Sequence, residues 1–366
     1  MKIAVIGAGI FGITSALKLR EKFPAAKIVI WDKNISILKA ASGINQYRLH
    51  RGYHYPRSNE TVDQVLNSVL EFEEYFSKSI LKNGFSHYYG ISKYGSKITA
   101  NEYIQFLESN DLPFEVIQTK KLPLHYDKID MVVKVVENGF DIADLHLGCI
   151  RQLRENNIEL KLGFTFEKAD FESYDLVINA TYSNINHLLN EDSQQDYQFE
   201  LCEKVVVSVG REYQKTGIVI LDGDFCCIDP LGREDYFHVL GHVKEAIHDV
   251  QIGKNYVIPG GYSEILNFGI LKNPLSRFPF ILRGCEEYFK FEGSPIIPTS
   301  VKRSNKLFGN VYYQGSMFTI RTVLPNRDHD DARPSEIIKH SDQFYSIFGG
   351  KIGTSVSIAN QLIKQI

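Results

Sequence analysis

The chain has 366 residues, enough for two domains or for one large α/β unit with an elaboration. Hydrophobic residues make up 43% of it and charged residues 23%, as in ordinary soluble globular proteins. The formal net charge of −3 excludes the strongly basic surface that is typical of proteins binding nucleic acid or anionic membranes.

The cysteines and the start of the chain predict a reduced, cytoplasmic protein. The five cysteines are scattered and form neither a C-x-x-C pair nor a zinc spacing, which favours free thiols. A strand-like run follows Met1 directly, so we expect no signal peptide. No apolar run approaches the ~20 residues of a transmembrane helix, so we expect no membrane span.

The first thirty-two residues read as a β-α-β unit. Residues 2–6 are a β-branched, apolar run that suits a buried parallel strand. Apolar positions then recur at helical spacing from Ile10 to about Phe23. A second strand over residues 27–31 ends at Asp32, which lies 32 − 12 = 20 residues past Gly12.

Between the first strand and the helix stands Gly7-Ala8-Gly9-Ile10-Phe11-Gly12, a G-x-G-x-x-G motif. Gly7 permits the tight turn, Gly9 lets a pyrophosphate approach the backbone, and Gly12 lets helix and strand pack closely. The start of the helix offers unpaired N–H groups to the phosphates, and Asp32 can accept hydrogen bonds from ribose hydroxyls. The unit therefore predicts dinucleotide binding.

The stretch over residues 34–56 indicates a second functional region. After a predicted short helix it is polar, aromatic and basic, without periodicity, which is typical of a segment lying over a site. A single histidine in such a segment is normally a satisfied or surface imidazole. Several donors and acceptors bunched beside a cofactor site favour function, and these are Asn45, Arg48, His50, Tyr53 and His54.

The middle of the chain alternates between helical and strand-like patterns. Spacing and capping predict helices over residues 60–82, 101–110, 144–155 (with Asp144 as the N-cap) and 279–289. Strand-like runs cover residues 87–92, 98–99, 131–137, 158–162, 165–167 and 175–179. The last of these resembles a buried parallel strand and ends in Ala180-Thr181.

Short alternating runs dominate residues 201–261, with glycine and Asp-Gly between them. These runs (204–209, 217–221, 225–228 and 236–243) predict a mostly antiparallel sheet. Further strands are expected over residues 311–314, 319–323 and 345–348. The predicted architecture is α/β, with a parallel nucleotide-binding sheet assembled from three separated pieces and antiparallel material inserted between them.

Two features near the carboxyl end could take part in binding or catalysis. In residues 349–355 a strand meets the last helix through Gly349, Gly350 and Gly353, with Lys351 among them. Such a helix start can stabilise negative charge on a phosphate or on a reduced flavin ring. Arg321 lies on a strand-like stretch and is either a clamp for a carboxylate or phosphate, or a paired structural arginine. The sequence contains no Ser/His/Asp triad signature and no metal-ligand spacing.

Taken together, these motifs resemble the D-amino-acid oxidase/glycerol-3-phosphate dehydrogenase (DAO) family of FAD-dependent oxidoreductases. The resemblance rests on the amino-terminal glycine motif and on the segment from Ala41-Ser42 to His50 and Gly52. It rests equally on Asn138-Gly139-Phe140-Asp141 and on Phe348-Gly349-Gly350-Lys351 followed by Gly353-Thr354. The Gly-Gly-Lys unit, with Arg321-x-x-x-Pro325 upstream, is nearer the glycerol-3-phosphate and 2-hydroxyacid branch.

The resemblance implies a Rossmann-like FAD-binding domain of the glutathione-reductase type with an inserted, mostly antiparallel substrate domain. The expected FAD-binding domain is residues 1–86, 136–200 and 315–366, and the substrate domain is residues 87–135 and 201–314. The implied cofactor-binding residues are Gly7, Gly9, Ile10, Phe11, Gly12, Asp32, Lys33, Ala41, Ser42, Asn45, Arg48, Leu49, His50, Ala180, Thr181, Gly350, Lys351, Ile352, Gly353 and Thr354.

The expected function is removal of a hydride from a CH–OH or CH–NH₂ carbon of a small, polar, anionic substrate. His50 or His54 is the expected base, Arg48 and Arg321 the expected anchors of the anion, and Tyr53 a further catalytic candidate. Two alternatives stay open. Asp32 stands where the family usually has glutamate, which leaves an NAD(P)-dependent dehydrogenase possible, and a flavin-binding protein without turnover is the other.

Overall fold

The structure is a computed structural model that describes residues 1–82, 84–223, 225–233, 236–295, 307–327 and 329–366. Its strands form a six-stranded, a ten-stranded and a three-stranded sheet. The α/β architecture with a parallel sheet and a mostly antiparallel one is as predicted.

The six-stranded sheet has the order β18-β19-β10-β1-β2-β9. Its parallel strands are β1 (Lys2–Ile6), β2 (Lys27–Asp32), β9 (Glu159–Leu162), β10 (Leu176–Asn179) and β19 (Phe344–Phe348), and β18 (Glu336–Lys339) is an antiparallel edge. The strands come from three separated parts of the chain, as predicted. Their carboxyl ends therefore meet at one edge, where open α/β sheets bind ligands.

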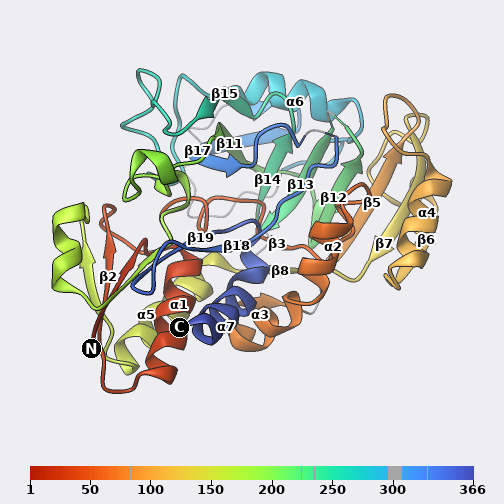
Figure 1. Cartoon of the computed structure of the whole chain (residues 1–366). Coiled ribbons are helices and arrows are strands. Elements are labelled where there is room, and N and C mark those ends of the chain that lie inside the picture. Colours follow the sequence, from red (N-terminus) through yellow and green to blue (C-terminus); the bar gives the residue numbers. More distant parts are fainter. Residues whose placement is uncertain (83, 224, 234–235, 296–306, 328) are drawn as a thin grey trace.

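Helices cover one face of this sheet, as Figure 1 shows. They are α1 (Ile10–Lys22), α3 (Val69–Tyr75), α5 (Ile142–Glu155) and α7 (Ser355–Gln365). Buried side chains such as Ile13, Leu17 and Leu145 belong to the same hydrophobic core as Ile3 and Val5 of β1. This core fixes the first and last helices side by side, although they are more than 300 residues apart in sequence.

The ten-stranded sheet has the order β16-β17-β11-β14-β13-β12-β5-β7-β6, and β15 also pairs with β11. The strands are β5 (Ser86–Ser92), β6 (Phe114–Ile117), β7 (Ile129–Val135), β11 (Tyr197–Ser208), β12 (Thr216–Leu221), β13 (Cys226–Leu231), β14 (Phe237–His242), β15 (Ile247–Gly253), β16 (Leu307–Phe308) and β17 (Val311–Val323). Only the pairing of β12 with β5 is parallel among the described strands of this sheet.

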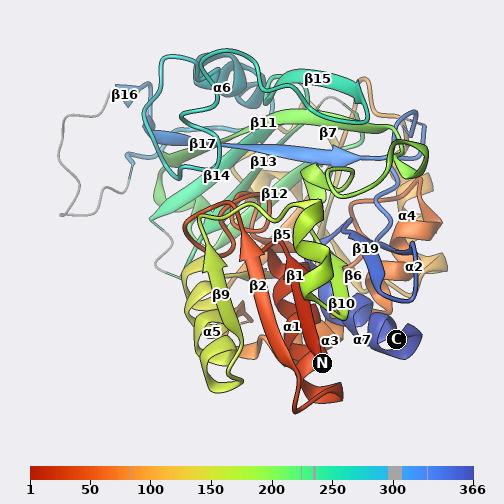
Figure 2. The ribbon, with the colours of Figure 1, turned by 60° about the vertical axis from the view of Figure 1, so that its left-hand side comes forward.

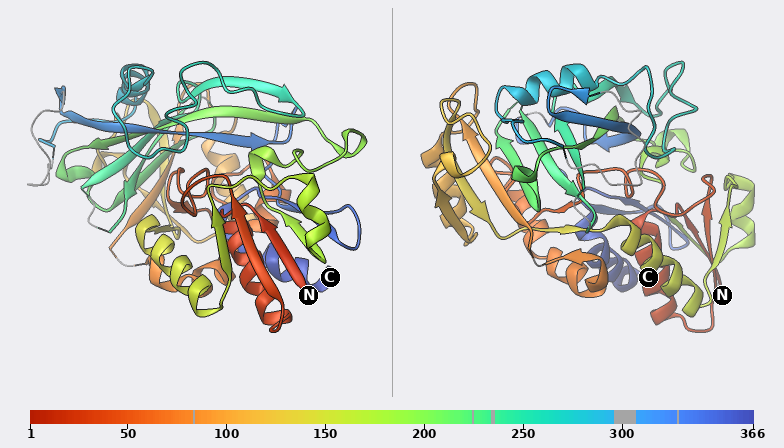
Figure 3. Two further views of the ribbon diagram at one scale, coloured as in Figure 1. Left: turned by 90° about the vertical axis from the view of Figure 1, so that its left-hand side faces the viewer. Right: turned by 180° about the vertical axis from the view of Figure 1, so that it is seen from behind.

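The strands of the six-stranded sheet point toward the ten-stranded sheet, which lies across their carboxyl ends in Figures 2 and 3. Helix α6 (Phe278–Glu286) covers the far side of the ten-stranded sheet, and α4 (Ala100–Ser109) lies beside β6 and β7. The small sheet of β3 (Arg48–Leu49), β4 (Ile80–Leu81) and β8 (Asn138–Phe140) and helix α2 (Asn59–Leu66) lie between the two large sheets.

The helix predicted over residues 60–82 is wrong as a single element. It is divided into α2 and α3, followed by a short 3-10 turn and β4. The break falls at Asn67 and Ser68, where the Ser68 hydroxyl donates to the carbonyl of Gln64 at 2.6 Å. Serine and asparagine side chains compete with the backbone for such hydrogen bonds, and the apolar spacing did not reveal this.

Other local predictions also needed correction. The short helix after Asp32 is absent, and residues 98–99 and 165–167 are not strands. Thr99 instead caps α4 with Glu102, and Asp141 rather than Asp144 caps α5, accepting from the N–H groups of Ala143 and Asp144. The runs at 311–314 and 319–323 form one strand, β17, that continues through Gly315 with an irregularity in its register against β11.

The domain boundaries proposed from the sequence remain a proposal. Strands β11 and β17 pair along most of their length in the ten-stranded sheet, and each extends across a proposed boundary, at residues 200/201 and 314/315. The five cysteines are free, as predicted. Within the described part of the chain, every helix is too short or too polar to cross a membrane.

Candidate active site

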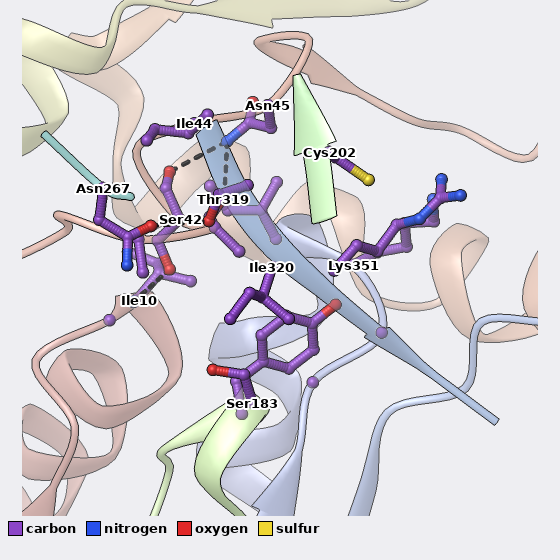
Figure 4. Close-up of a pocket in the computed structure, with 18 of the residues that line it drawn as sticks. Ile10, Ser42, Ile44, Asn45, Ser183, Cys202, Asn267, Thr319, Ile320 and Lys351 are labelled. Atoms are coloured by element: carbon purple, nitrogen blue, oxygen red, sulfur yellow. Dashed lines mark hydrogen bonds between the residues drawn. The ribbon is translucent and has the colours of Figure 1, made fainter. Parts of the chain in front are cut away.

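A cavity of about 660 Å³ lies where the two large sheets meet. Its wall includes the carboxyl ends of β1, β2 and β10, the loop of Gly349 to Ile352, and the facing side of β11, β13 and β14. Figure 4 shows Ile10 and Ser42 from the amino-terminal part of the chain and Lys351 from the carboxyl-terminal loop around this one space. The size is that of a typical cofactor or ligand site.

The glycine motif occupies one end of the cavity with the predicted geometry. Gly7 has a φ of +103°, and a Cβ there would lie 2.5 Å from the carbonyl oxygen of Ala180. A side chain on Gly12 would collide with the carbonyl of Gly7, so this glycine sets the close packing of α1 on β1. Gly9 lines the cavity, and a Cβ there would approach the Ser42 hydroxyl at 3.1 Å.

Asp32 stands at the end of β2 and lines the cavity beside this motif. Its Oδ2 accepts the N–H of Ala8 at 2.7 Å, and its Oδ1 accepts the N–H of Asn34 at 2.7 Å. The Ser42 hydroxyl accepts the N–H of Ile10 at 3.0 Å, at the start of α1. Asp32 Oδ1 also accepts Asn34 Nδ2 at 2.8 Å. The acid therefore holds the glycine loop in place with three of its roughly four lone-pair sites and keeps about one for a ribose hydroxyl.

A cluster of aromatic rings lies at the other end of the cavity. The ring centroids of His50 and His54 are 5.2 Å apart, and those of His54 and Tyr55 are 5.1 Å apart. The Lys351 ammonium lies 4.6 Å from the centre of the Tyr55 ring. The predicted second region and the predicted carboxyl-terminal loop thus meet in one place.

Burial sets the charges in this cluster. It lowers the pKa of His50 well below its usual value, and the Lys351 and Arg48 charges lower it further. Burial also lowers the pKa of His54. Burial lowers the pKa of Lys351 to about 7. Both imidazoles are therefore neutral near pH 7, whereas Lys351 is close to its midpoint.

Arg48 is buried, and its guanidinium forms ion pairs with two carboxylates. Its Nη2 pairs with Asp229, and its Nη1 donates to the Tyr89 hydroxyl at 3.2 Å. Its Nε is 3.6 Å from Glu137 Oε2. Two carboxylates thus compensate one guanidinium, so Arg48 is not the free anion anchor that the sequence suggested.

Glu137 is a functional candidate that the sequence did not reveal. Its carboxylate is buried, and its Oε1 lies 3.6 Å from His50 Nδ1. The same carboxylate accepts the backbone N–H of Arg51 at 2.8 Å and the Tyr89 hydroxyl at 2.8 Å. A signal was present, because Glu137 directly precedes the motif of residues 138–141.

Arg321 lines the cavity as predicted, but its guanidinium pairs with Glu200, whose side chain is buried. The Glu200 carboxylate also accepts Gln198 Nε2 at 2.8 Å. The guanidinium of Arg321 therefore has no uncompensated charge for a substrate anion. Its contacts are those of the paired structural arginine, the second of the two predicted roles.

Tyr53, the further catalytic candidate, does not line the cavity. Its ring is buried in the core beneath β5 and β7, and its hydroxyl donates to the carbonyl of Pro113 at 2.8 Å. Leu49 is likewise a core residue. Gly353 and Thr354 lie behind the loop, where the Thr354 hydroxyl donates to the carbonyl of Lys351 at 2.7 Å, so they support the loop rather than face the cavity.

Most predicted site residues do line the same cavity. They are Gly7, Gly9, Ile10, Phe11, Asp32, Lys33, Ala41, Ser42, Asn45, Arg48, His50, His54, Ala180, Thr181, Arg321, Gly350, Lys351 and Ile352. Gly12, Leu49, Tyr53, Gly353 and Thr354 do not line it.

Several buried polar atoms of the cavity wall have no hydrogen-bond partner among the described residues. They are Gln46 Oε1, His54 Nδ1, Tyr55 OH and Asp229 Oδ2, whereas the likewise unbonded Arg48 Nε and His50 Nδ1 each lie 3.6 Å from Glu137. A buried polar atom left unpaired costs about 1–3 kcal/mol, so their concentration at one end marks a surface built to face a polar ligand. Together with the glycine motif and Asp32, the cavity fits an adenine dinucleotide that carries a polar ring system.

The lowered pKa of Lys351 gives a testable dependence of stability on pH. In the unfolded chain this lysine keeps its usual pKa of 10.5, so between pH 7 and 10.5 the unfolded state holds a proton that the folded state lacks. The free energy of unfolding therefore rises with pH across this window. Lys351→Met should be more stable than wild type at pH 7, and the difference should shrink toward pH 10.

Denaturant unfolding of flavin-free protein at several pH values checks this expectation. Parallel stability curves for wild type and Lys351→Met would contradict the assignment of a buried, uncompensated ammonium.

Comparisons with known proteins point to one family. The model of the family described as FAD dependent oxidoreductase (DAO) matches residues 2–293. A curated relative, the FAD-dependent monooxygenase FPY4 of Fusarium mangiferae, is 26% identical over 213 residues, which are 54% of this chain and 53% of the relative. The chain thus matches about half the length of that relative.

Solved structures share the fold. Glycine oxidase from Geobacillus kaustophilus superposes with a TM-score of 0.68 and 12% identity, covering 99% of this chain and 93% of that one. The FAD-bound L-alpha-glycerophosphate oxidase from Mycoplasma pneumoniae has a TM-score of 0.66 and 14% identity, covering 100% of this chain and 94% of that one.

Proposed function

The chain belongs to the DAO family of FAD-dependent oxidoreductases, and we propose that it removes a hydride from a CH–OH or CH–NH₂ carbon of a small polar acid. Membership of this family makes the chain an FAD-dependent oxidoreductase, with FAD as its cofactor. The nicotinamide alternative that Asp32 left open and the flavin-binding protein without turnover are therefore set aside.

We infer that the cavity holds FAD along its length. The backbone of Gly7 and Gly9 and the start of α1 suit the diphosphate, and Asp32 suits a ribose. Gly350 and Lys351 suit the flavin ring, where a positive charge stabilises negative charge on reduction. When bound, FAD accepts the hydride and supplies the oxidising chemistry.

The observation that carries the proposal is His50, a neutral imidazole on the cavity wall with a carboxylate behind it. Its Nδ1 faces Glu137, which favours a proton on Nδ1 and leaves Nε2 free to accept one. An alcohol must lose its hydroxyl proton as the hydride leaves, and this imidazole is placed to take it. For an amine the neutral free base reacts without this help.

Glu137→Gln should weaken His50 as a base. The substitution keeps one acceptor oxygen, for either the Arg51 N–H or the Tyr89 hydroxyl, and removes the negative charge that stabilises a protonated imidazole. Each pKa unit that His50 loses lowers the equilibrium constant for its protonation about tenfold. The rate of anaerobic flavin reduction should fall, and the acid limb of its pH profile should move to lower pH.

Glu73→Gln is the matched control, since Glu73 is also buried and binds Arg51 but is not paired with His50. An equal movement of the acid limb in both variants would assign the effect to general structural damage instead.

A second candidate is monooxygenation, because the curated fungal relative carries that description. In such a reaction NAD(P)H, rather than the organic substrate, reduces the flavin. Anaerobic incubation of the yellow protein with a panel of hydroxy acids, amino acids and NAD(P)H separates the two. Bleaching by an acid supports the proposal, whereas bleaching by NAD(P)H alone would replace it.

A further inference from the structure

Behind His50, four side chains from different elements form one buried array. Arg48 is on β3, Tyr89 on β5 and Asp229 on β13, and Glu137 lies between β7 and β8. The side chains of the three charged residues are at most 2% exposed. Because β3 lies between the two large sheets (Figure 1), the buried array connects the ten-stranded sheet to the segment that carries the proposed base.

The contacts within the array are unequal. Arg48 Nη2 is hydrogen-bonded to Asp229 Oδ1, whereas Arg48 Nε is 3.6 Å from Glu137 Oε2 and makes no hydrogen bond to it. The Tyr89 hydroxyl accepts Arg48 Nη1 at 3.2 Å and donates to Glu137 Oε2 at 2.8 Å. Asp229 is therefore the closer acid to the guanidinium, and Glu137 is the acid that faces His50 Nδ1 at 3.6 Å.

The charges of the array do not cancel. One guanidinium and two carboxylates give a net charge of 1 − 2 = −1 while His50 is neutral. A proton on His50 brings the total to zero. Buried charges interact more strongly than charges in water, so the excess negative charge favours proton uptake at the imidazole and opposes the effect of burial.

A glycine on the neighbouring strand makes room for the Asp229 carboxylate. Gly217 of β12 lies opposite Asp229, one position beyond the pair of Ile218 and Ile228. A Cβ on Gly217 would lie 3.0 Å from Asp229 Oδ1 and 2.5 Å from His87 Nδ1. His87 adds no charge here, because burial lowers its pKa to about 3. The local sequence therefore leaves space for the carboxylate at the point where it meets the guanidinium.

Other titratable groups lie around the array. Those near His50 are Lys351, His54 and Tyr55, and those near Asp229 are Lys204, Cys227 and His87. After burial, the Lys351 and Arg48 charges lower the pKa of His50 further. Burial raises the pKa of Asp229, whereas Arg48 lowers it. Asp229 thus compensates one of the two cations that oppose protonation of His50.

Resting on the proposed function, we propose that Asp229 is a positioning residue for the base His50. It binds Arg48 and compensates the charge of the guanidinium, so that the negative charge of Glu137 stays available to the protonated imidazole. Its effect on the base passes through Arg48 and Glu137. The ten-stranded sheet, on which Asp229 stands, therefore sets the basicity of a residue that belongs to another sheet region of the cavity wall.

The test is Asp229→Asn in the FAD-loaded protein, since the amide keeps an acceptor for Arg48 and removes the charge. NMR titration of labelled histidines in the oxidised protein gives the protonation midpoint of His50, whose signal is the one lost in His50→Gln. The midpoint should fall by roughly one pH unit or less, because a unit charge at an effective dielectric constant of about 20 still acts over about 10 Å. The acid limb of anaerobic flavin reduction should move to lower pH by the same amount.

Two further variants make the shift specific. Asp229→Glu keeps the charge and should restore the midpoint. Glu203→Gln should leave it unchanged, because the Glu203 carboxylate is also buried in the ten-stranded sheet but binds His248 Nε2 and the N–H of Arg277. Should Asp229→Asn not fold, Gly217→Ala takes its place, since the added methyl group displaces the carboxylate and should lower the midpoint in the same direction.

The outcomes separate this inference from the proposed function. An unmoved midpoint in Asp229→Asn, an equal fall in Glu203→Gln, no restoration in Asp229→Glu, or a wild-type His50 that stays neutral wherever the protein is folded overturns the role of Asp229. If no substrate bleaches the flavin while the midpoint falls as expected, the proposed reaction fails and the role of Asp229 stands. If the flavin is reduced and the acid limb does not move, the proposed reaction stands and the role of Asp229 fails.

Discussion

Replacing His50 with alanine is expected to slow anaerobic flavin reduction by an alcohol substrate about 10²–10⁴-fold, the range of general base catalysis. The reason is that the imidazole lines the cavity, is kept neutral by burial, and has Glu137 at 3.6 Å behind Nδ1. Stopped-flow absorbance of the flavin band measures the rate constant directly.

His54→Ala is the natural comparison. His54 also lines the cavity and is neutral, but among the described residues no carboxylate lies behind its ring within ion-pair distance. Its loss should reduce the rate less than loss of His50. Full turnover in His50→Ala with flavin still bound would remove His50 from the role of base, and a larger loss in His54→Ala would transfer the role to that residue.

Gly7→Ala is expected to destabilise the folded protein by about 2–4 kcal/mol and to abolish retention of FAD. The backbone of Gly7 has a φ of +103°, and the new methyl group would meet the carbonyl oxygen of Ala180 at 2.5 Å. The two strands would have to separate at the point where the dinucleotide enters. Denaturant unfolding and the flavin content after gel filtration measure the two effects.

Gly148→Ala serves as the control for a glycine-to-alanine change. Gly148 lies inside α5, and an added Cβ would meet nothing within 4 Å, so alanine should stabilise the helix by up to about 1 kcal/mol. Opposite signs are therefore expected for the two variants. Normal flavin content in Gly7→Ala would contradict the placement of the diphosphate at this turn.

The sequence predicted those parts of the site that depend on local pattern. Each of these parts is a short motif whose residues lie close together in the sequence. They are the glycine motif, the strand ending at Asp32 and the Gly-Gly-Lys loop. Topology then joins them, because the carboxyl ends of parallel strands share an edge. Ile10, Asp32 and Lys351 accordingly line one cavity, as Figure 4 shows for Ile10 and Lys351.

The electrostatics of the site could not be predicted in the same way. Arg48 and Asp229 are 181 residues apart, and Arg321 and Glu200 are 121 residues apart, so no local spacing signals that either arginine is compensated. Glu200 and Arg321 are register partners on β11 and β17, whereas Arg48 on β3 of the three-stranded sheet meets Asp229 of β13 in another sheet. Glu137 was overlooked although it directly precedes the motif of residues 138–141, because its role depends on the distant His50, which the fold places beside it.

A crystal structure of the FAD-loaded protein tests the central claim most directly, which is that one FAD spans the cavity between the two sheets. We predict the diphosphate at Gly9 and the start of α1, a ribose at Asp32, and the flavin ring between the Lys351 loop and His50. A flavin ring that contacts neither His50 nor Lys351, or an adenine half away from the glycine motif, would contradict the account.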